Sequence, residues 1–172
     1  FLIQRRRFLF DGDGSGFENA PIELSDERLL VKIRALQLEN NIKQSLSKPF
    51  GPSCRCALDI EMETGTGKTY CYIKTIFELN KRYGWSKFIV VVPSIAIREG
   101  VKKSFEMMED HFFEHYGKKA RYFIYNSKNL NQLDNFSASK DIYVMIINAQ
   151  AFASSLKAVS YTHLRAHETL SD

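Results

Sequence analysis

Residues 64–69, which read Thr-Gly-Thr-Gly-Lys-Thr, constrain the fold of this chain more than any other segment. They follow an alternation of apolar and acidic residues that predicts a strand over residues 56–62. They precede apolar residues at helical spacing over residues 68–83, with Gly84 as a stop signal. A glycine-rich turn between a strand and a helix lets the backbone direct several N–H groups at one phosphate. The segment therefore predicts a phosphate-binding loop within an α/β fold.

The residue types of this loop suit a nucleoside triphosphate with Mg²⁺. The two glycines permit tight backbone turns, and the start of the following helix adds its positive end. Lys68 is the candidate catalytic residue, because its ammonium group suits the β- and γ-phosphates. The hydroxyl of Thr69 is the candidate Mg²⁺ ligand. The predicted cofactor-binding set from this loop is Thr64, Gly65, Thr66, Gly67, Lys68 and Thr69.

The rest of the chain predicts alternating helices and strands. A helix begins near Ser25, which can cap it, and ends near Asn40, and residues 45–55 read as a linker. Strands are expected over residues 87–92, 121–125 and 142–147, with a long helix over 94–117 and a short one over 129–136. This order is typical of a mostly parallel sheet with helices on both faces, in which ligands bind at the carboxyl ends of the strands.

Composition restricts the class of protein further. The 172 residues are 44% hydrophobic and 26% charged, which is a globular mixture and excludes wholesale disorder. The apolar runs are far shorter than a membrane span, so no membrane partner is expected. The net charge of +4 is thinly spread, so it permits a polyanionic partner without requiring one. Three cysteines without framework spacing predict free thiols and a cytoplasmic location.

Two motifs carry a resemblance to a known family. Residues 61–70, Glu-Met-Glu-Thr-Gly-Thr-Gly-Lys-Thr-Tyr, and residues 91–100, Val-Val-Pro-Ser-Ile-Ala-Ile-Arg-Glu-Gly, resemble the Res subunit of type III restriction–modification enzymes. Residues 124–128 and 144–152 are similar to less specific segments of that family. Met62 stands where the strict phosphate-loop pattern has Gly, as is common in superfamily 2 helicases and translocases. The resemblance implies an incomplete RecA-like P-loop NTPase lobe over residues 56–157.

The resemblance also implies an activity, partners and further site residues. The parent would be an ATP-dependent hydrolase that moves on double-stranded DNA and cuts it, together with a methyltransferase (Mod) subunit. Pro93, Ser94 and Arg98 would lie near the DNA, and Gln37 would contact the adenine of ATP. The alternatives stay open that Ser94 only caps a helix, that Arg98 is solvated, and that Gln37 is a surface residue. For this fragment we expect weak Mg·ATP binding at most and negligible turnover.

Several parts of such a motor are missing from the chain. No second acidic motif follows a later strand, and we expect it, the second lobe and the nuclease domain to lie outside this sequence. Residues 158–172 resemble translated sequencing-adapter read-through, which predicts a non-native tail. Residues 1–24 are expected to be irregular, and residues 25–55 to form a helix and linker. Another superfamily 2 helicase or translocase, or an unrelated P-loop kinase or ATPase, remains the alternative function.

One further pattern is not absorbed by this hypothesis. His111-Phe-Phe-Glu-His115 fits the H-x-x-E-H pattern of some zinc proteases, and a helix would place both imidazoles on one face. A hydrolytic zinc site needs a third protein ligand, and none stands at a suitable place downstream. The pattern is therefore not assigned to zinc hydrolysis.

Overall fold

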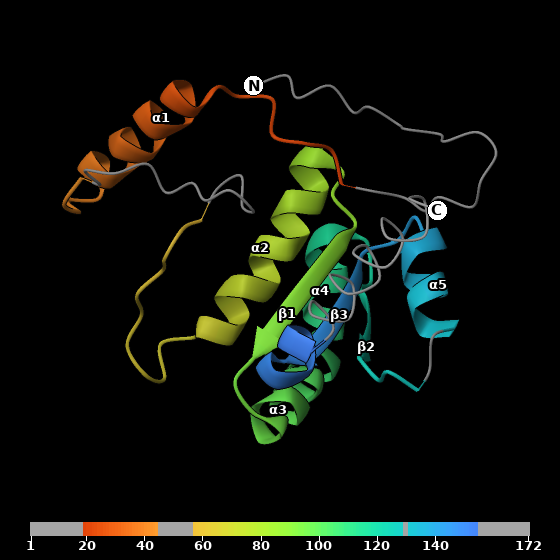
Figure 1. The fold of residues 1–172 in the computed structure, drawn as a ribbon. Coiled ribbons are helices and arrows are strands. Elements are labelled where there is room, and N and C mark those ends of the chain that lie inside the picture. Colours follow the sequence, from red (N-terminus) through yellow and green to blue (C-terminus); the bar gives the residue numbers. More distant parts are fainter. Residues whose placement is uncertain (1–18, 45–56, 129–130, 155–172) are drawn as a thin grey trace, which may run out of the picture.

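The computed structural model describes residues 19–44, 57–128 and 131–154. The predicted linker and the predicted non-native tail therefore lie outside the described residues. The sheet contains β1 (Lys87–Val92), β2 (Arg121–Ile124) and β3 (Tyr143–Asn148). Its order is β1-β3-β2, and both pairs are parallel, as predicted from the alternation of elements. The helices are α1 (Asp26–Glu39), α2 (Lys68–Tyr83), α3 (Ile95–Met107), α4 (Glu109–Tyr116) and α5 (Asn131–Ala138) (Figure 1).

Helices lie on both faces of this sheet, which confirms the predicted α/β class. Phe88 pairs with Val144 and Val90 with Ile146, so these side chains share one face and pack with α2, α3 and α4 in the main core. On the other face, Phe136 of α5 contacts Phe123 at 5.8 Å between ring centroids. β3 is the central strand, and its residues from Val144 to Ile147 are all buried. A strand buried on both faces reads as a continuous apolar run, which is how it appears in the sequence.

The long helix predicted over residues 94–117 is two helices, which meet at Met108. Ser94 caps α3 as expected, and Gly117 ends α4 in the left-handed conformation. The break follows from two different packing partners. Phe105 of α3 stacks on Tyr122 of the sheet at 5.2 Å, whereas Phe112 of α4 stacks on Phe77 of α2 at 4.8 Å. One straight helix cannot serve both surfaces, so the prediction of a single helix was wrong.

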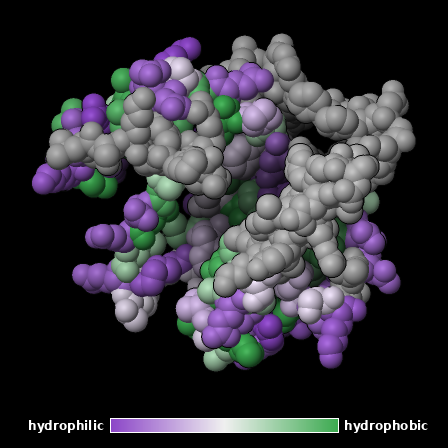
Figure 2. Space-filling model, in the orientation of Figure 1, coloured by the Kyte–Doolittle hydropathy of each residue, from purple (hydrophilic) through white to green (hydrophobic). Residues whose placement is uncertain are grey.

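The strand predicted over residues 56–62 is also wrong for its described part. Residues 57–63 have no regular secondary structure, and Leu58 and Ile60 are 63% and 70% exposed. Alternating apolar and polar residues form a strand only where a neighbouring strand provides hydrogen-bond partners for the backbone. Here a cavity of about 480 Å³ separates Ile60 and Met62 from β1. In Figure 2 the surface beside α2 is hollowed, and apolar residues show within the hollow.

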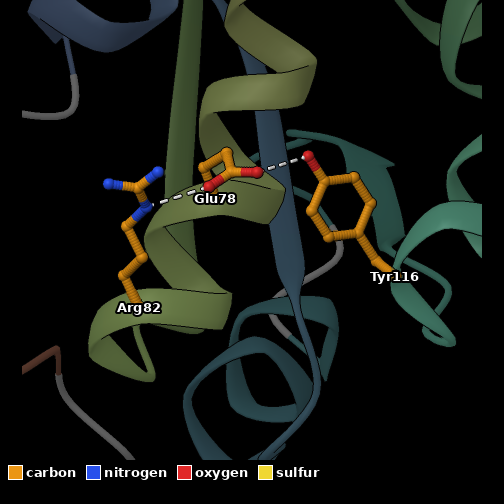
Figure 3. Close-up of polar contacts among 3 residues, drawn as sticks. All are labelled: Glu78, Arg82 and Tyr116. Carbon is orange, nitrogen blue, oxygen red and sulfur yellow. Dashed lines mark hydrogen bonds and ion pairs between the residues drawn. The ribbon is translucent and has the colours of Figure 1, made fainter.

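A polar contact joins α2 to α4 at the edge of the core. Glu78 of α2 accepts hydrogen bonds from Tyr116 of α4 at 2.8 Å and from Arg82 at 2.9 Å (Figure 3). The bond from Tyr116 is the main reason that the pKa of Glu78 lies below its usual value. Burial and the same bond raise the pKa of Tyr116 to about 12. The contact therefore favours the ionised carboxylate and the neutral phenol.

The side chain of Asn19 connects the segment before α1 to the start of β1. Asn19 accepts hydrogen bonds from the backbone N–H groups of Ser86 and Lys87 at 2.8 and 3.0 Å. Its amide donates to the Lys87 carbonyl at 2.6 Å. Asn19 thereby supplies partners that a neighbouring strand would otherwise provide. Within the described ranges, no helix has the length and apolar character needed to cross a membrane.

Candidate functional site

The glycine-rich loop adopts the backbone conformation that its sequence predicts. Gly65 and Gly67 have φ values of 82° and 94°, which lie in the region that only glycine adopts readily. Gly67 is also the N-cap of α2, and it makes no side-chain cap because it has no side chain. The first amide groups of α2 have no acceptor within the helix, since the first helical bond runs from the Cys71 N–H to the Gly67 carbonyl. The loop thus leads into a helix start with donors directed toward the loop.

Lys68 closes this loop over its own backbone. Its Nζ atom donates hydrogen bonds to the carbonyl oxygens of Met62 at 2.8 Å and Glu63 at 2.6 Å. The hydroxyl of Thr66 donates to the same Glu63 carbonyl at 2.7 Å. These acceptors are neutral, whereas a phosphate oxygen is charged and accepts a stronger hydrogen bond from an ammonium group. An anion in the loop can therefore replace the two carbonyl oxygens as the hydrogen-bond partner of Lys68.

The donor set fits a phosphate group together with Mg²⁺. It combines backbone N–H groups at a helix start, one ammonium group and the half-buried Thr69 hydroxyl in the first turn of α2. Within the described ranges, no group of three or more His, Cys, Asp or Glu side chains could hold a metal ion without further ligands. Mg²⁺ commonly takes one or two protein ligands and completes its shell with phosphate oxygens and water. A phosphate-bound Mg²⁺ is thus compatible with these residues.

An apolar cavity lies next to the loop. It has a volume of about 480 Å³ and extends from Lys68 and Tyr72 to the outer edge of β1. The Tyr72 hydroxyl is buried and makes no hydrogen bond with good geometry. Burial raises the pKa of Tyr72, and its contact with the Thr69 side chain offsets part of this rise. The sequence did not point to this cavity, because it depends on where the loop and α2 lie relative to β1. The apolar lining makes this cavity a poor site for a triphosphate.

The structure does not bring Gln37 to the loop. Gln37 lies on α1, which sits beside the C-terminal end of α2, whereas the loop precedes the N-terminal end (Figure 1). A cavity of about 530 Å³ between these helices is lined by Leu36 of α1 and by Leu79 and Tyr83 of α2. A helix of 16 residues is roughly 24 Å long, so the two ends of α2 are far apart. In this arrangement Gln37 does not share a site with the loop.

The residues predicted to lie near DNA are found where β1 ends. Pro93 and Ser94 are exposed, and the Ser94 hydroxyl accepts a hydrogen bond from the Ile97 N–H at 3.3 Å. Arg98 forms an ion pair with Glu99 at 3.1 Å, and its side chain is only 20% exposed, so it is not simply solvated. The buried Nε atom of Arg98 has no hydrogen-bond partner. The starts of α2 and α3 both lie at the carboxyl end of the sheet, so the loop and residues 93–98 share one edge (Figure 1).

Comparison with known proteins matches the chain to one family. The family model described as "Type III restriction enzyme, res subunit" matches residues 32–170. The EcoP15I Res subunit of Escherichia coli is 34% identical over 149 residues, which cover 76% of this chain and 15% of that protein. The EcoPI Res subunit of Escherichia phage P1 is 31% identical over 148 residues, with the same coverage of 76% and 15%.

A third relative matches a shorter stretch. The StyLTI Res subunit of Salmonella typhimurium is 44% identical over 61 residues, or 34% of this chain and 6% of that protein. The chain thus spans about 15% of the length of the first two relatives. The family match runs to residue 170 and so includes most of residues 158–172. The interpretation of those residues as a non-native tail stays a prediction.

Proposed function

The chain belongs to the family of type III restriction enzyme Res subunits, and from this premise we propose that residues 64–69 bind Mg·ATP. One observation carries the proposal. Gly67 has a left-handed backbone and directly precedes the first helical turn, which contains Lys68 and Thr69. This arrangement puts the free amides of α2, an ammonium group and a hydroxyl around one position.

The residues of the loop have separate parts in this proposal. The amides at the start of α2 bind phosphate oxygens, and the helix adds its positive end. Lys68 leaves the carbonyls of Met62 and Glu63 and pairs with the β- and γ-phosphates. The Thr69 hydroxyl ligates Mg²⁺. Hydrolysis of ATP supplies the free energy for movement of the parent along DNA, and this chain lacks the second acidic motif that hydrolysis needs.

We further propose that the parent is an ATP-dependent DNA translocase and endonuclease subunit. Its partners are double-stranded DNA and a methyltransferase (Mod) subunit. On this chain, Pro93, Ser94 and Arg98 form a surface for a DNA phosphate, because the amides at the start of α3 and a guanidinium group with an unpartnered Nε lie together there. This surface and the loop share the carboxyl edge of the sheet, so nucleotide and DNA would bind on the same side.

Calorimetric titration of Mg·ATP tests the loop assignment. The wild-type chain is expected to bind weakly, and Lys68→Ala to show no measurable binding, because the ammonium group is lost. Lys74→Ala is the matched control, since it removes an exposed lysine of the same helix and leaves the loop unchanged. Lys74→Ala should bind like the wild type. Equal affinity of the wild type and Lys68→Ala would refute the assignment.

A separate titration tests the DNA surface. A double-stranded oligonucleotide should bind more weakly as the salt concentration rises, because phosphate contacts release counterions. Arg98→Ala should weaken this binding more than Lys74→Ala, although both variants lose one positive charge. Salt-independent binding, or equal effects of the two variants, would contradict the proposed surface.

A further inference from the structure

His111 and His115 lie one turn apart on α4, and neither belongs to the residues proposed to bind Mg·ATP or DNA. Both side chains are exposed, and their ring centroids are 4.4 Å apart with an angle of 43° between the rings. Residues four apart on a helix lie on the same face. The two imidazoles are therefore neighbours in space and open to solvent on one side.

The hydrogen bond of His115 determines which of its nitrogens can bind a metal ion. Its Nδ1 atom lies 2.8 Å from the backbone carbonyl oxygen of His111. A carbonyl oxygen can only accept, so Nδ1 carries the proton and Nε2 of the neutral ring keeps its lone pair. Histidines that bind metal ions usually donate their other ring N–H to a carbonyl or carboxylate in this way. The hydrogen bond thus gives His115 the tautomer and the fixed ring orientation that are typical of a metal ligand.

His111 is held in place by two aromatic neighbours. Its Nε2 atom is 3.1 Å from the Tyr70 hydroxyl, and its ring meets Phe112 edge-on at 5.2 Å. In the tautomer of His111 that carries its proton on Nδ1, the Tyr70 hydroxyl donates to Nε2, and Nε2 has a lone pair for a metal ion. Tyr70 comes from the first turn of α2, directly after Thr69. The ring of His111 is therefore fixed between α2 and its own helix, close to the ring of His115.

We propose that His111 and His115 bind one divalent first-row transition-metal ion, such as Zn²⁺ or Ni²⁺, through their Nε2 atoms. Imidazole nitrogen is a preferred ligand for these ions, and water completes the coordination. Within the described ranges no third His, Cys, Asp or Glu joins the pair, so there the site consists of two imidazoles with room for water. The ion takes the place of the Tyr70 hydroxyl at His111 Nε2, so the site adjoins the first turn of α2.

Calorimetric titration of the whole chain with Ni²⁺, in a non-thiol reductant, tests this site. The chain has two more histidines, His163 and His167, which are also four residues apart. We expect His115→Ala to weaken Ni²⁺ binding by roughly 10²-fold, because the second imidazole acts at a high effective concentration. The double variant His163→Ala/His167→Ala is the matched control and should leave binding by the first pair unchanged.

Two outcomes of this titration would overturn the proposal. The first is loss of Ni²⁺ binding in the His163→Ala/His167→Ala variant together with full binding in His115→Ala. The second is an affinity of the wild-type chain no higher than that of His115→Ala. Circular dichroism shows whether each variant keeps its helices, and His115→Gln repeats the test with a side chain of similar polarity. Tyr70→Phe should bind Ni²⁺ at least as tightly as the wild type, because it removes the competing hydrogen bond. Weaker binding in Tyr70→Phe would overturn the assignment of His111 Nε2.

Discussion

Replacement of Gly67 by alanine should weaken nucleotide binding without unfolding the domain. Gly67 has φ = 94° and ψ = 30°, and a Cβ atom added there would meet nothing within 4 Å. The added methyl group therefore causes no steric clash, and the substitution acts only through the backbone conformation. The left-handed region costs a non-glycine residue about 1–2 kcal/mol. The same range corresponds to a factor of about 5–30 in an equilibrium constant, which is the expected loss of Mg·ATP affinity.

Two other glycines provide controls for the same chemical change. Gly117 ends α4 with φ = 64° and is followed closely by the buried Ala120, so the backbone there cannot relax as freely as in the loop. Gly117→Ala should therefore lower the free energy of unfolding by about 1–2 kcal/mol and leave Mg·ATP affinity unchanged. Gly100 lies within α3, and a Cβ there also meets nothing within 4 Å. Gly100→Ala should raise stability by about 1 kcal/mol, because alanine is the better helix former.

Urea unfolding followed by circular dichroism measures stability, and calorimetry measures Mg·ATP affinity. Because residues 64–68 are exposed, the loop can relax in Gly67→Ala without disturbing the core, so its unfolding midpoint should stay near that of the wild type. Mg·ATP binding by Gly67→Ala that is as tight as that of the wild type would contradict the backbone effect. An equal loss of affinity in Gly117→Ala would show that the effect does not belong to the loop.

Three further predictions concern the stability of the fold. Phe112 is 2% exposed and stacks on Phe77, so Phe112→Ala should lower the free energy of unfolding in urea by about 3–5 kcal/mol. Phe113→Ala on the exposed side of α4 should lower it far less, and equal losses would contradict the packing. The pKa of Tyr116 is raised from 10.0 to about 12, so the folded chain holds this proton more tightly than the unfolded chain. The contribution of Tyr116 to the free energy of unfolding is complete below pH 10 and is lost as the pH rises to about 12. Tyr116→Phe should therefore flatten the fall of the melting temperature in this window, and an unchanged slope would disprove the link. Asn19→Ala should lower the free energy of unfolding by about 1–3 kcal/mol, because the Ser86 and Lys87 amides lose their acceptor. Hydrogen exchange at these two amides should become faster, and unchanged protection would show that Asn19 is dispensable.

Signals within a few residues of the chain were sufficient for most elements. Ser25 and Ser94 mark the starts of α1 and α3, and Gly84 and Gly117 mark the ends of α2 and α4. The strand predicted over residues 142–147 differs from β3 by one residue at each end. Caps, breaks and apolar runs act through neighbouring residues, so they can be recognised without knowledge of the rest of the molecule.

The candidate loop belongs to the same class of local features. Its glycines have positive φ values and its lysine opens α2, as the residue types and their spacing predict. The role of Gln37 is different, because it depends on where α1 packs. The structure places α1 at the far end of α2, a position that no residue near Gln37 specifies. The hydrogen bond between Tyr70 and His111 likewise joins residues 41 positions apart.

Local sequence signals were enough to predict the glycine-rich turn ahead of α2, the alternation of helices and strands, and the resemblance to the Res family. The packing of the whole chain leaves residues 57–63 without regular secondary structure, breaks the helix at Met108 and brings His111 to Tyr70, and none of these could be read from local signals. The physical reason is the range of the interactions. Backbone torsion preferences and capping bonds act within one turn, whereas strand pairing and side-chain packing require a partner surface that distant residues must supply.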